Sequence, residues 1–347
     1  MRSVTYDSWR RERNRRQRVE LEDFLRRTLV DGYATRREDA WRRDHTDEDA
    51  YAASVEPNRR RWARLLGVPE LKPAGPVEVE DHPLRDDVTT KWVRLPLDNG
   101  LSAEAVLATP RGDHDGRLVV FQHGLDSVPE IAFGVCDESG AYHEAGVELV
   151  RRGFTVLAPF NVAGYEERNR LQRLAWIGGG LVEGIEFARA RCLLDVVADL
   201  APVDPGRIGM WGQSWGGLAT QYWMPLEPRL RAGVISSYFN ERLGKLAVPD
   251  PRYTCFLDTP AFHAHHPGLL REFADADLLS LICPRPVMVQ HGRADDIGWP
   301  AEVAAEFERA REHWARLGHA DRVRLELHGG GHEVEPDSAI TWLERWL

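Results

Sequence analysis

The chain has 347 residues, of which 43% are hydrophobic and 29% charged, and its formal net charge is −10 at pH 7. This length allows one large domain with a smaller appendage, and the composition is that of an ordinary globular protein. The negative charge argues against a nucleic-acid partner, because binding to phosphates requires a basic surface. The sequence shows no secretory signal and no apolar run of membrane-spanning length, so we expect a cytoplasmic protein with no membrane contact.

Residues 1–80 differ from the rest of the chain because they are rich in Arg, Glu and Asp and carry apolar side chains at helical spacing. One apolar stripe runs over residues 21–29, and a second over residues 62–66 ends at Gly67 and Pro69. These features predict a small helical N-terminal segment. Isolated helices of this length are marginal in water, so we expect the segment to dock beside the mouth of the functional site or to form the subunit interface of a homo-oligomer.

Residues 81–347 read as a second unit in which short apolar strands alternate with helices. Residues 88–97 and 101–109 flank Asp98-Asn99-Gly100 and predict a β-hairpin, because Asn-Gly supplies the positive φ that a tight turn needs. The alternation predicts an α/β domain with a mostly parallel, doubly wound sheet that is entered through this antiparallel hairpin. The further strands are expected at 118–122, 154–159, 208–211, 232–237, 286–290 and 323–327, and the helices at 141–152, 181–200, 218–226, 301–317 and 338–346.

Two stretches interrupt this alternation. Residues 161–180 and 238–277 are longer than simple connections and show little regular pattern. We interpret both as loops at a binding site, and residues 238–277 as a lid or site insertion within the catalytic domain.

A serine between two glycines follows the strand at 208–211. The run Gly212-Gln213-Ser214-Trp215-Gly216 matches Gly-x-Ser-x-Gly, in which a strand turns sharply into a helix and exposes the serine hydroxyl. A positive φ at Ser214 brings the residues two before and two after it close together, and glycines there avoid a clash. Ordinary strand-to-helix turns also match this pattern, so the assignment depends on the partners downstream.

Two later strands end in loops that carry a candidate acid and a candidate base. Residues 291–296 (His-Gly-Arg-Ala-Asp-Asp) follow one strand, and residues 328–333 (His-Gly-Gly-Gly-His-Glu) follow the last. The order serine, acid, histidine, each after a strand, is the order in which hydrolases with a nucleophile elbow place their triad.

The candidate base is His332, because its glycine-rich loop can bring the ring over the elbow, whereas His328 on the strand end is expected to pack or to make a structural hydrogen bond. The acid is Asp295 or Asp296, and the usual spacing of three residues after Gly292 favours Asp295. The oxyanion formed during attack needs two backbone donors, for which we expect the N–H groups of Trp215 and Leu125, while the side chain of His123 is expected to be structural.

Aromatic and polar side chains are mixed in the expected site loops, and such a mixture suits a ring-shaped polar substrate better than a long acyl chain. The candidate substrate-binding residues are Trp176, Tyr238, Asn240, Arg242 and Trp299. Some of these rings could instead pack the loops. No phosphate loop or dinucleotide fingerprint is present, and His263, His265 and His266 lack a nearby carboxylate or cysteine, so we expect neither a cofactor nor a metal.

From about residue 88 to 347 the chain resembles the α/β-hydrolase superfamily, in the group that includes dienelactone hydrolases, acetyl xylan esterases and prolyl oligopeptidase-type peptidases. Residues 234–240 (Val-Ile-Ser-Ser-Tyr-Phe-Asn), 281–286 (Leu-Ile-Cys-Pro-Arg-Pro) and 330–333 (Gly-Gly-His-Glu) are similar to bacterial acetyl xylan esterase-like hydrolases, some of which are carbohydrate esterases. The resemblance implies a triad of Ser214, Asp295 and His332.

A second similarity points to a different substrate. Residues 124–130 (Gly-Leu-Asp-Ser-Val-Pro-Glu), together with the helical N-terminal segment, resemble hydrolases of the 2,6-dihydroxypseudooxynicotine hydrolase type, which cleave a carbon–carbon bond with the same triad. The leading hypothesis is a serine esterase that acts on a small polar ester such as a sugar acetyl or methyl ester. A carbon–carbon hydrolase and a small-peptide hydrolase are the alternatives, although 80 helical residues cannot build the β-propeller that prolyl oligopeptidase-type peptidases carry.

Overall fold

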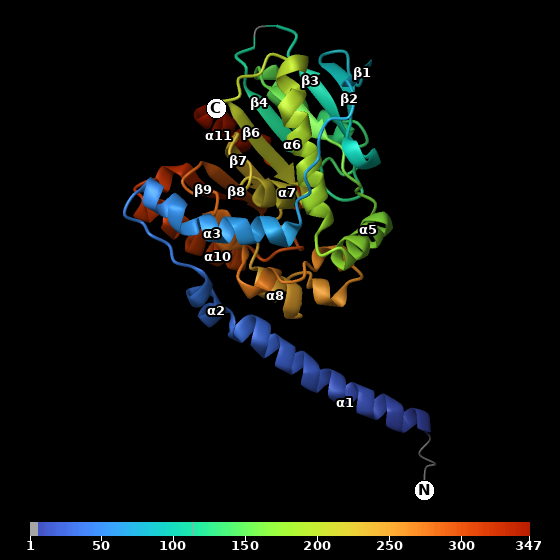
Figure 1. The fold of residues 1–347 in the computed structure, drawn as a ribbon, viewed down its shortest axis with the longest axis vertical. Helices are drawn as coiled ribbons and strands as arrows, with labels where there is room; N and C mark the ends of the chain where they lie inside the picture. Colours follow the sequence, from blue (N-terminus) through green and yellow to red (C-terminus); the bar gives the residue numbers. More distant parts are fainter. Residues whose placement is uncertain (1–5, 113) are drawn as a thin grey trace.

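One sheet runs through the computed structural model, which describes residues 6–112 and 114–347 (Figure 1). In this part of the chain nine strands form the sheet in the order β1-β2-β3-β5-β4-β6-β7-β8-β9. The pairs β1/β2, β2/β3 and β3/β5 are antiparallel, and all other neighbours are parallel. The strands are β1 (Glu78–Asp81), β2 (Thr89–Pro96), β3 (Ser102–Thr109), β4 (Leu118–Gln122), β5 (Thr155–Pro159), β6 (Ile208–Gln213), β7 (Leu230–Ser236), β8 (Val287–Gly292) and β9 (Val323–His328).

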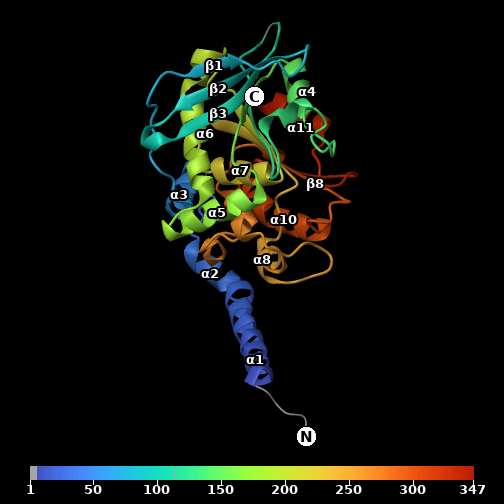
Figure 2. The same cartoon turned by 90° about the vertical axis from the view of Figure 1, so that its right-hand side faces the viewer.

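Helices connect the strands and cover both faces of the sheet (Figure 2). None of the helices in the described residues is long and apolar enough to cross a bilayer. The α-helices are α1 (Tyr6–Arg26), α2 (Tyr33–Ala40), α3 (Glu48–Leu66), α4 (Ala145–Arg151), α5 (Tyr165–Ile177), α6 (Val182–Leu200), α7 (Trp215–Trp223), α8 (Arg242–Ala247), α9 (Asp275–Ser280), α10 (Pro300–Arg316) and α11 (Pro336–Trp346). A π-helical turn, η1 (Arg27–Asp31), and 3₁₀ turns η2 (Asp98–Gly100), η3 (Pro129–Phe133), η4 (Phe256–Asp258), η5 (Phe262–Ala264), η6 (Leu269–Arg271) and η7 (Ala320–Arg322) complete the set.

The predicted α/β architecture and its entry hairpin are confirmed. Strands β2 and β3 pair in register from Thr89 opposite Thr109 to Pro96 opposite Ser102. Between them Asn99 has φ 61° and Gly100 has φ 76°, the left-handed conformations that the Asn-Gly pair predicted. The turn therefore fixes the register of the antiparallel edge.

Each central strand buries alternate side chains in two separate cores. In β6, Met210 belongs to the core under α3, α6, α7 and α10, and Trp211 belongs to the core under α4 and α11. A strand sends successive side chains to opposite faces, so a sheet covered on both sides needs apolar residues at every position. This explains why the parallel strands appear in the sequence as continuous apolar runs.

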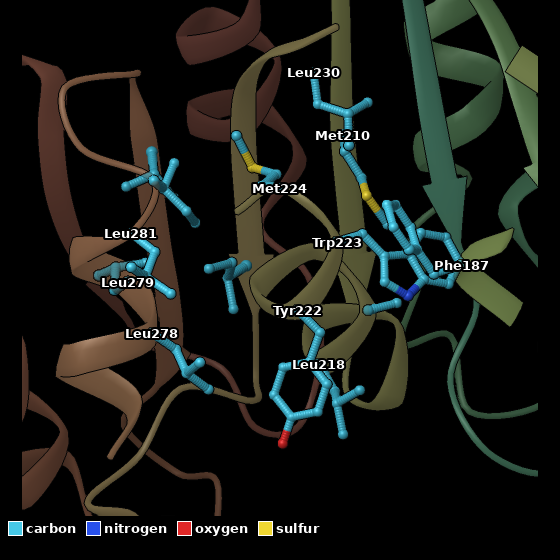
Figure 3. Close-up of a cluster of buried hydrophobic side chains, with 14 of the residues drawn as sticks. Phe187, Met210, Leu218, Tyr222, Trp223, Met224, Leu230, Leu278, Leu279 and Leu281 are labelled. Carbon is cyan, nitrogen blue, oxygen red and sulfur yellow. The ribbon is translucent and has the colours of Figure 1, made fainter. Parts of the chain in front are cut away.

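The helix that follows the serine lies in the larger core. Leu218, Tyr222 and Trp223 of α7 pack with Phe187 of α6 and with leucines of residues 278–281 around α9 (Figure 3). All nine residues of α7 are buried. Apolar packing on every side holds this helix, and with it the turn that precedes it, in one position.

Helix α3 docks the N-terminal segment on α7. Its Trp62 is completely buried, donates its indole N–H to Tyr222 O at 3.1 Å, and meets the Tyr222 ring edge-on at 4.6 Å between centroids. Nearby, Tyr33, Arg37 and Arg43 all bind the carboxylate of Asp277 in α9, which has no exposed side-chain surface. Residues 33–66 are thus part of the main body of the molecule.

Helix α1 behaves differently because none of its residues is buried. It projects away from the body in both views (Figures 1 and 2). The apolar stripe predicted for residues 21–29 therefore stays largely open, and Leu21, Phe24 and Leu25 each expose more than half of their surface. Helices α2 and α3 therefore dock on the catalytic domain, against α7 and α9, whereas α1 does not dock on it.

The sequence pattern did not predict helix α5, because this helix buries polar side chains and exposes apolar ones. It runs over residues 165–177, within a stretch interpreted as a loop. Its buried side chains are the polar Arg168, Asn169 and Gln172, whereas Leu174 and Ile177 are 58% and 86% exposed. An apolar-stripe search cannot find a helix whose buried face is polar. The short helices α8 and α9 and the fully exposed edge strand β1 also escaped the sequence pattern.

Removal of residues 1–25 should abolish self-association, because we expect the exposed apolar side chains of α1 to be covered by a second copy of the chain. The basic run of residues 10–18 in α1 would then lie against a second copy of the chain, whose net charge is −10. Light scattering after gel filtration should show the intact chain as an oligomer and the shortened chain as a monomer with an unchanged thermal midpoint. A monomeric intact chain would contradict this expectation.

Candidate active site

Ser214 sits at the turn between β6 and α7 in a strained backbone conformation. Its φ and ψ are 55° and −117°, which a non-glycine residue adopts only when the surroundings impose it. Its N–H donates to Ser236 O at the end of β7, at 2.8 Å. The predicted sharp turn is confirmed, and it leaves Ser214 half-buried, at the wall of a cavity.

The flanking glycines are required by this turn. A Cβ atom on Gly212 would lie 1.9 Å from Gly216 O, and one on Gly216 would lie 1.9 Å from Gln122 O. Contacts of this length to backbone atoms cannot be relieved by rotating a side chain. The glycines therefore allow the start of α7 to approach β4 and β6 closely enough to form the turn.

The residues predicted as acid and base are in contact. His332 Nδ1 lies 2.8 Å from Asp295 Oδ2, and the other carboxylate oxygen accepts from Ile297 N–H at 2.9 Å. Burial raises the pKa of Asp295, but the hydrogen bond and the charge of His332 outweigh it and hold the pKa below its usual value. An ionised carboxylate has no proton to donate, so Nδ1 donates and Nε2 is left as the basic nitrogen.

The choice between the two aspartates follows from exposure. Only 4% of Asp295 is exposed, whereas Asp296 is exposed to solvent. His328 Nδ1 accepts from Gly330 N–H at 3.2 Å, which is a structural hydrogen bond within its own loop. The geometry therefore pairs His332 with Asp295.

The loops after β8 and β9 are joined by backbone contacts. Arg293 N donates to His328 O and Ala294 N donates to Gly330 O, both at 2.9 Å. A Cβ on Gly292 would lie 2.0 Å from Gly331 O, so only glycine permits this approach. These contacts fix the position of the acid loop relative to the histidine loop.

A buried hydrogen-bond chain joins the strand ends below these loops. Trp211 Nε1 donates to Ser236 Oγ at 2.9 Å, Ser236 Oγ donates to Gln290 Oε1 at 2.7 Å, and Gln290 Nε2 donates to Glu335 O at 2.7 Å. Because Ser236 and Gln290 have no exposed surface, each needs these partners. The chain links β6, β7 and β8 to the segment that carries His332.

The loop after β4 places Leu125 beside the serine. Gly124 N–H donates to Tyr142 Oη at 2.7 Å, and Leu125, Ser214 and Trp215 line one cavity. In the described residues neither Leu125 N–H nor Trp215 N–H donates to another protein group. His123 is buried, with its pKa lowered to about 4 by desolvation, and its Nε2 accepts from Asn161 N–H at 3.3 Å. His123 thus makes a structural contact, as the sequence suggested.

Behind Trp215 lies a buried ionic cluster. The Arg168 guanidinium lies 4.9 Å from the Trp215 ring and binds Glu183 at 3.0 Å and Glu186 at 2.7 Å. These charged side chains are almost completely buried. A buried charge is tolerated only when it is paired, so the cluster holds α5 against α6 at the back of the site.

A cavity of about 250 Å³ opens at Ser214. Of its nineteen lining residues, nine come from residues 238–277 and none comes from residues 1–80. The lining residues are Leu125, Tyr165, Ser214, Trp215, Ser237, Tyr238, Asn240, Arg242, Lys245, Thr254, Phe256, Thr259, Ala261, His263, His291, Asp295, Ile297, Gly298 and His332.

The predicted substrate-binding residues divide into two groups. Tyr238, Asn240 and Arg242 line the cavity. Trp299 lies outside this lining, where its ring is stacked 3.7 Å from the Arg252 guanidinium. Trp176 lines a separate apolar cavity with Leu29, Leu246 and other residues. The structure therefore does not bring these two tryptophans to the serine.

Sequence reasoning did not single out several of the cavity residues, and Lys245 and His291 are the two of these with nitrogen groups buried at the cavity wall beside the acid loop. Lys245 is 2% exposed and His291 is 2% exposed. His291 immediately precedes Gly292 of the acid loop, so its place at the strand end was a usable signal, whereas nothing in the sequence around Lys245 marked it. Among the described residues no group of His, Cys, Asp or Glu side chains could hold a metal ion.

The chain matches no known protein-family profile. It is 26% identical over 305 residues to the Bacillus subtilis (strain 168) protein YtaP, which is provisionally named a hydrolase, and the match covers 83% of this chain and 98% of that protein.

Solved structures show the same fold at low sequence identity. A Bacteroides fragilis protein provisionally named an acetyl xylan esterase superposes with a TM-score of 0.66 at 15% identity, over 83% of this chain and 78% of that one. Methylesterase BT1017 gives 0.59 at 19% identity over 87% and 64%, and a CE15 glucuronoyl esterase from Teredinibacter turnerae gives 0.58 at 17% over 88% and 89%. The chain therefore has the α/β-hydrolase fold.

Replacement of Asp295 by Asn should lower kcat by about 10⁴, because an amide in place of the carboxylate disturbs the tautomer of His332. Asp296→Asn is the matched control, since its side chain is exposed, and it should change kcat far less. Steady-state kinetics on one ester substrate decide the matter. A larger loss of kcat in Asp296→Asn than in Asp295→Asn would show that Asp296, and not Asp295, is the acid.

Proposed function

We propose that this chain is a serine esterase that hydrolyses a carboxylic ester of a small polar molecule. The observation that carries the proposal is the convergence of three loops. The strained Ser214, the paired Asp295 and His332, and two free backbone N–H groups all meet at one cavity.

In the proposed mechanism Ser214 Oγ attacks the ester carbonyl while His332 Nε2 takes its proton. The imidazolium that forms is stabilised by Asp295, and the oxyanion accepts hydrogen bonds from Leu125 N–H and Trp215 N–H. Collapse of the tetrahedral intermediate transfers the proton from His332 to the leaving alcohol and leaves an acyl group on Ser214. A water molecule, deprotonated by His332, then attacks the carbonyl of the acyl group. This step releases the carboxylic acid and restores the Ser214 hydroxyl.

The comparisons support hydrolysis and an ester substrate. YtaP carries the name of a hydrolase, and the similar solved structures include a methylesterase and a glucuronoyl esterase. A shared fold does not by itself carry an activity, because one fold supports many chemistries. The proposal therefore rests first on the geometry of Ser214, His332 and Asp295.

The size of the cavity supports a small substrate. Its volume of about 250 Å³ is below the roughly 300–1,000 Å³ of common ligand pockets. The polar side chain of Asn240 interrupts its apolar wall, and a long alkyl chain would leave the Asn240 Nδ2 donor without a partner. These two properties favour a short acyl or methyl ester on a polar molecule, such as an acetylated or methyl-esterified sugar.

We expect hydrolysis of p-nitrophenyl esters to fall steeply from acetate to octanoate, and an acetylated or methyl-esterified sugar to be a better substrate than either. Ser214→Ala should lower kcat by about 10⁶ because it removes the nucleophile. Steady-state assays of the intact chain and this variant provide the test.

Two results would contradict the proposal. Faster turnover of octanoate than of acetate would indicate a lipase-like site and would reject the small polar substrate. If all esters were inert while a β-diketone was cleaved, the chain would be a carbon–carbon hydrolase with the same triad.

A further inference from the structure

The wall of the cavity holds an ammonium group without a carboxylate partner. Lys245 of α8 lines the cavity although only 2% of its surface is exposed. Its Nζ donates to Ile297 O and lies 4.8 Å from the centroid of the Phe256 ring. Among the described residues no carboxylate is within ion-pairing distance of Nζ. An ammonium carries three N–H donors, and these contacts supply a single oxygen acceptor.

The other charged groups of the cavity are already paired. Arg242 Nε and Nη2 bind the two carboxylate oxygens of Asp275 at 3.0 and 2.7 Å, so a buried acid matches this guanidinium. Asp295 uses one oxygen for His332 and the other for Ile297 N–H. The positive charge of Lys245 is therefore the one that an anionic ligand could balance.

Two neutral polar groups beside Lys245 in the cavity lining also lack acceptors. Asn240 Oδ1 accepts from Glu241 N–H at 3.0 Å, while Asn240 Nδ2 has no acceptor among the described residues. Both ring nitrogens of His291 are buried and have no hydrogen-bond partner among the described residues, and Nδ1 lies 4.0 Å from Asp295 Oδ2. A Cβ on Gly298 would lie 2.6 Å from Asn240 Nδ2 and 2.6 Å from His291 Cε1, so the two side chains meet at this glycine. Burial lowers the pKa of His291, and its neutral ring can donate one hydrogen bond.

We propose that Lys245, with Asn240 and His291, forms a subsite for a free carboxylate of the substrate, so that the preferred esters carry a second, unesterified carboxyl group. This inference rests on the proposed function because it names the substrate class of the same site. A carboxylate offers acceptors in several directions and would supply the partners that these donors lack. A neutral ester of the same shape would leave the buried ammonium unpaired, which is the arrangement that rejects analogues most strongly.

The carboxylate could belong to the acyl part or to the alcohol part of the ester, and two pairs of small esters separate these cases. Monomethyl glutarate is compared with methyl 5-methylhexanoate, and 3-acetoxypropanoate with 3-methylbutyl acetate. In each pair an isopropyl group replaces the carboxylate at nearly constant shape. The ratio of kcat/KM values within a pair measures the preference for the anion and cancels effects on the triad that both substrates share.

The charge of Lys245 gives the preference a characteristic pH dependence. Burial lowers the pKa of Lys245 to about 7, and Arg242 acts in the same direction, whereas Asp295, Cys255 and Asp296 oppose the shift. Because the pKa is lowered, the ammonium is charged below about pH 7 and loses its charge above it. The substrate carboxylate stays ionised throughout this range, and effects on the triad are shared by both members of a pair. Burial lowers the pKa of His291, so this ring stays a neutral donor and does not produce the change expected near pH 7.

At pH 6.5 one anionic ester should be preferred over its neutral partner by about tenfold to hundredfold, the range expected when a charged hydrogen-bonding group gains or lacks its partner. The preference should decline between pH 6 and 9. Lys245→Met should reduce it by at least about tenfold, and Lys245→Arg should retain it above pH 8. Lys91→Met, which alters an exposed lysine on β2, is the matched control and should leave the preference unchanged.

Three outcomes would overturn the inference. If the intact chain hydrolyses neutral esters but prefers neither anion, the carboxylate subsite fails and the proposed esterase stands. If Lys245→Met lowers both members of a pair equally, or the preference is constant from pH 6 to 9, Lys245 has a structural role. If the intact chain hydrolyses none of the four esters and no aryl ester, the proposed function itself is wrong.

Discussion

The site depends on the positive φ of Ser214. This conformation is costly for a residue with a side chain, and it persists because three surrounding elements impose it. The N–H of Ser214 is bound by β7, the carbonyl of Gly216 lies against the Cα of Gly212, and α7 is buried on all sides. The packing of the sheet and of α7 thus holds Ser214 in the conformation that places it at the wall of the cavity.

The N-terminal segment supports this arrangement from behind. Trp62 of α3 fixes Tyr222 of α7, and Tyr222 Oη lies 3.0 Å from His266 Nδ1. His266 in turn lies 3.6 Å from Glu183, which binds the Arg168 guanidinium that stacks on Trp215. A continuous set of buried contacts therefore connects α3 to the residue whose N–H is proposed to bind the oxyanion. Helix α1 takes no part in it, since none of its residues is buried.

The sequence predicted those parts of the site that depend on local backbone chemistry. The glycines around Ser214, the Asn-Gly turn and the glycine-rich loop before His332 each restrict the chain within a few residues, so their positions could be read directly. The spacing after Gly292 also selected Asp295, whose side chain the structure places against His332.

Features that depend on distant packing could not be predicted. Helix α5 buries Arg168 because α6 supplies Glu183 and Glu186, and no apolar periodicity marks such a helix. Lys245 reaches the cavity only because α8 packs against the loop that contains Ile297. Trp176 and Trp299 lie in segments near the site in sequence, but the first lines another cavity and the second stacks on Arg252.

The central claim is that the fold activates Ser214 as a nucleophile, and covalent trapping tests it most directly. A fluorophosphonate is attacked by an activated serine with loss of fluoride, so the intact chain should gain the mass of one phosphonyl group, which peptide mapping should place on Ser214. Ser214→Ala should gain none, and Asp295→Asn should react much more slowly than Asp296→Asn. Absence of an adduct on the intact chain, or an adduct that persists in Ser214→Ala, would contradict the account.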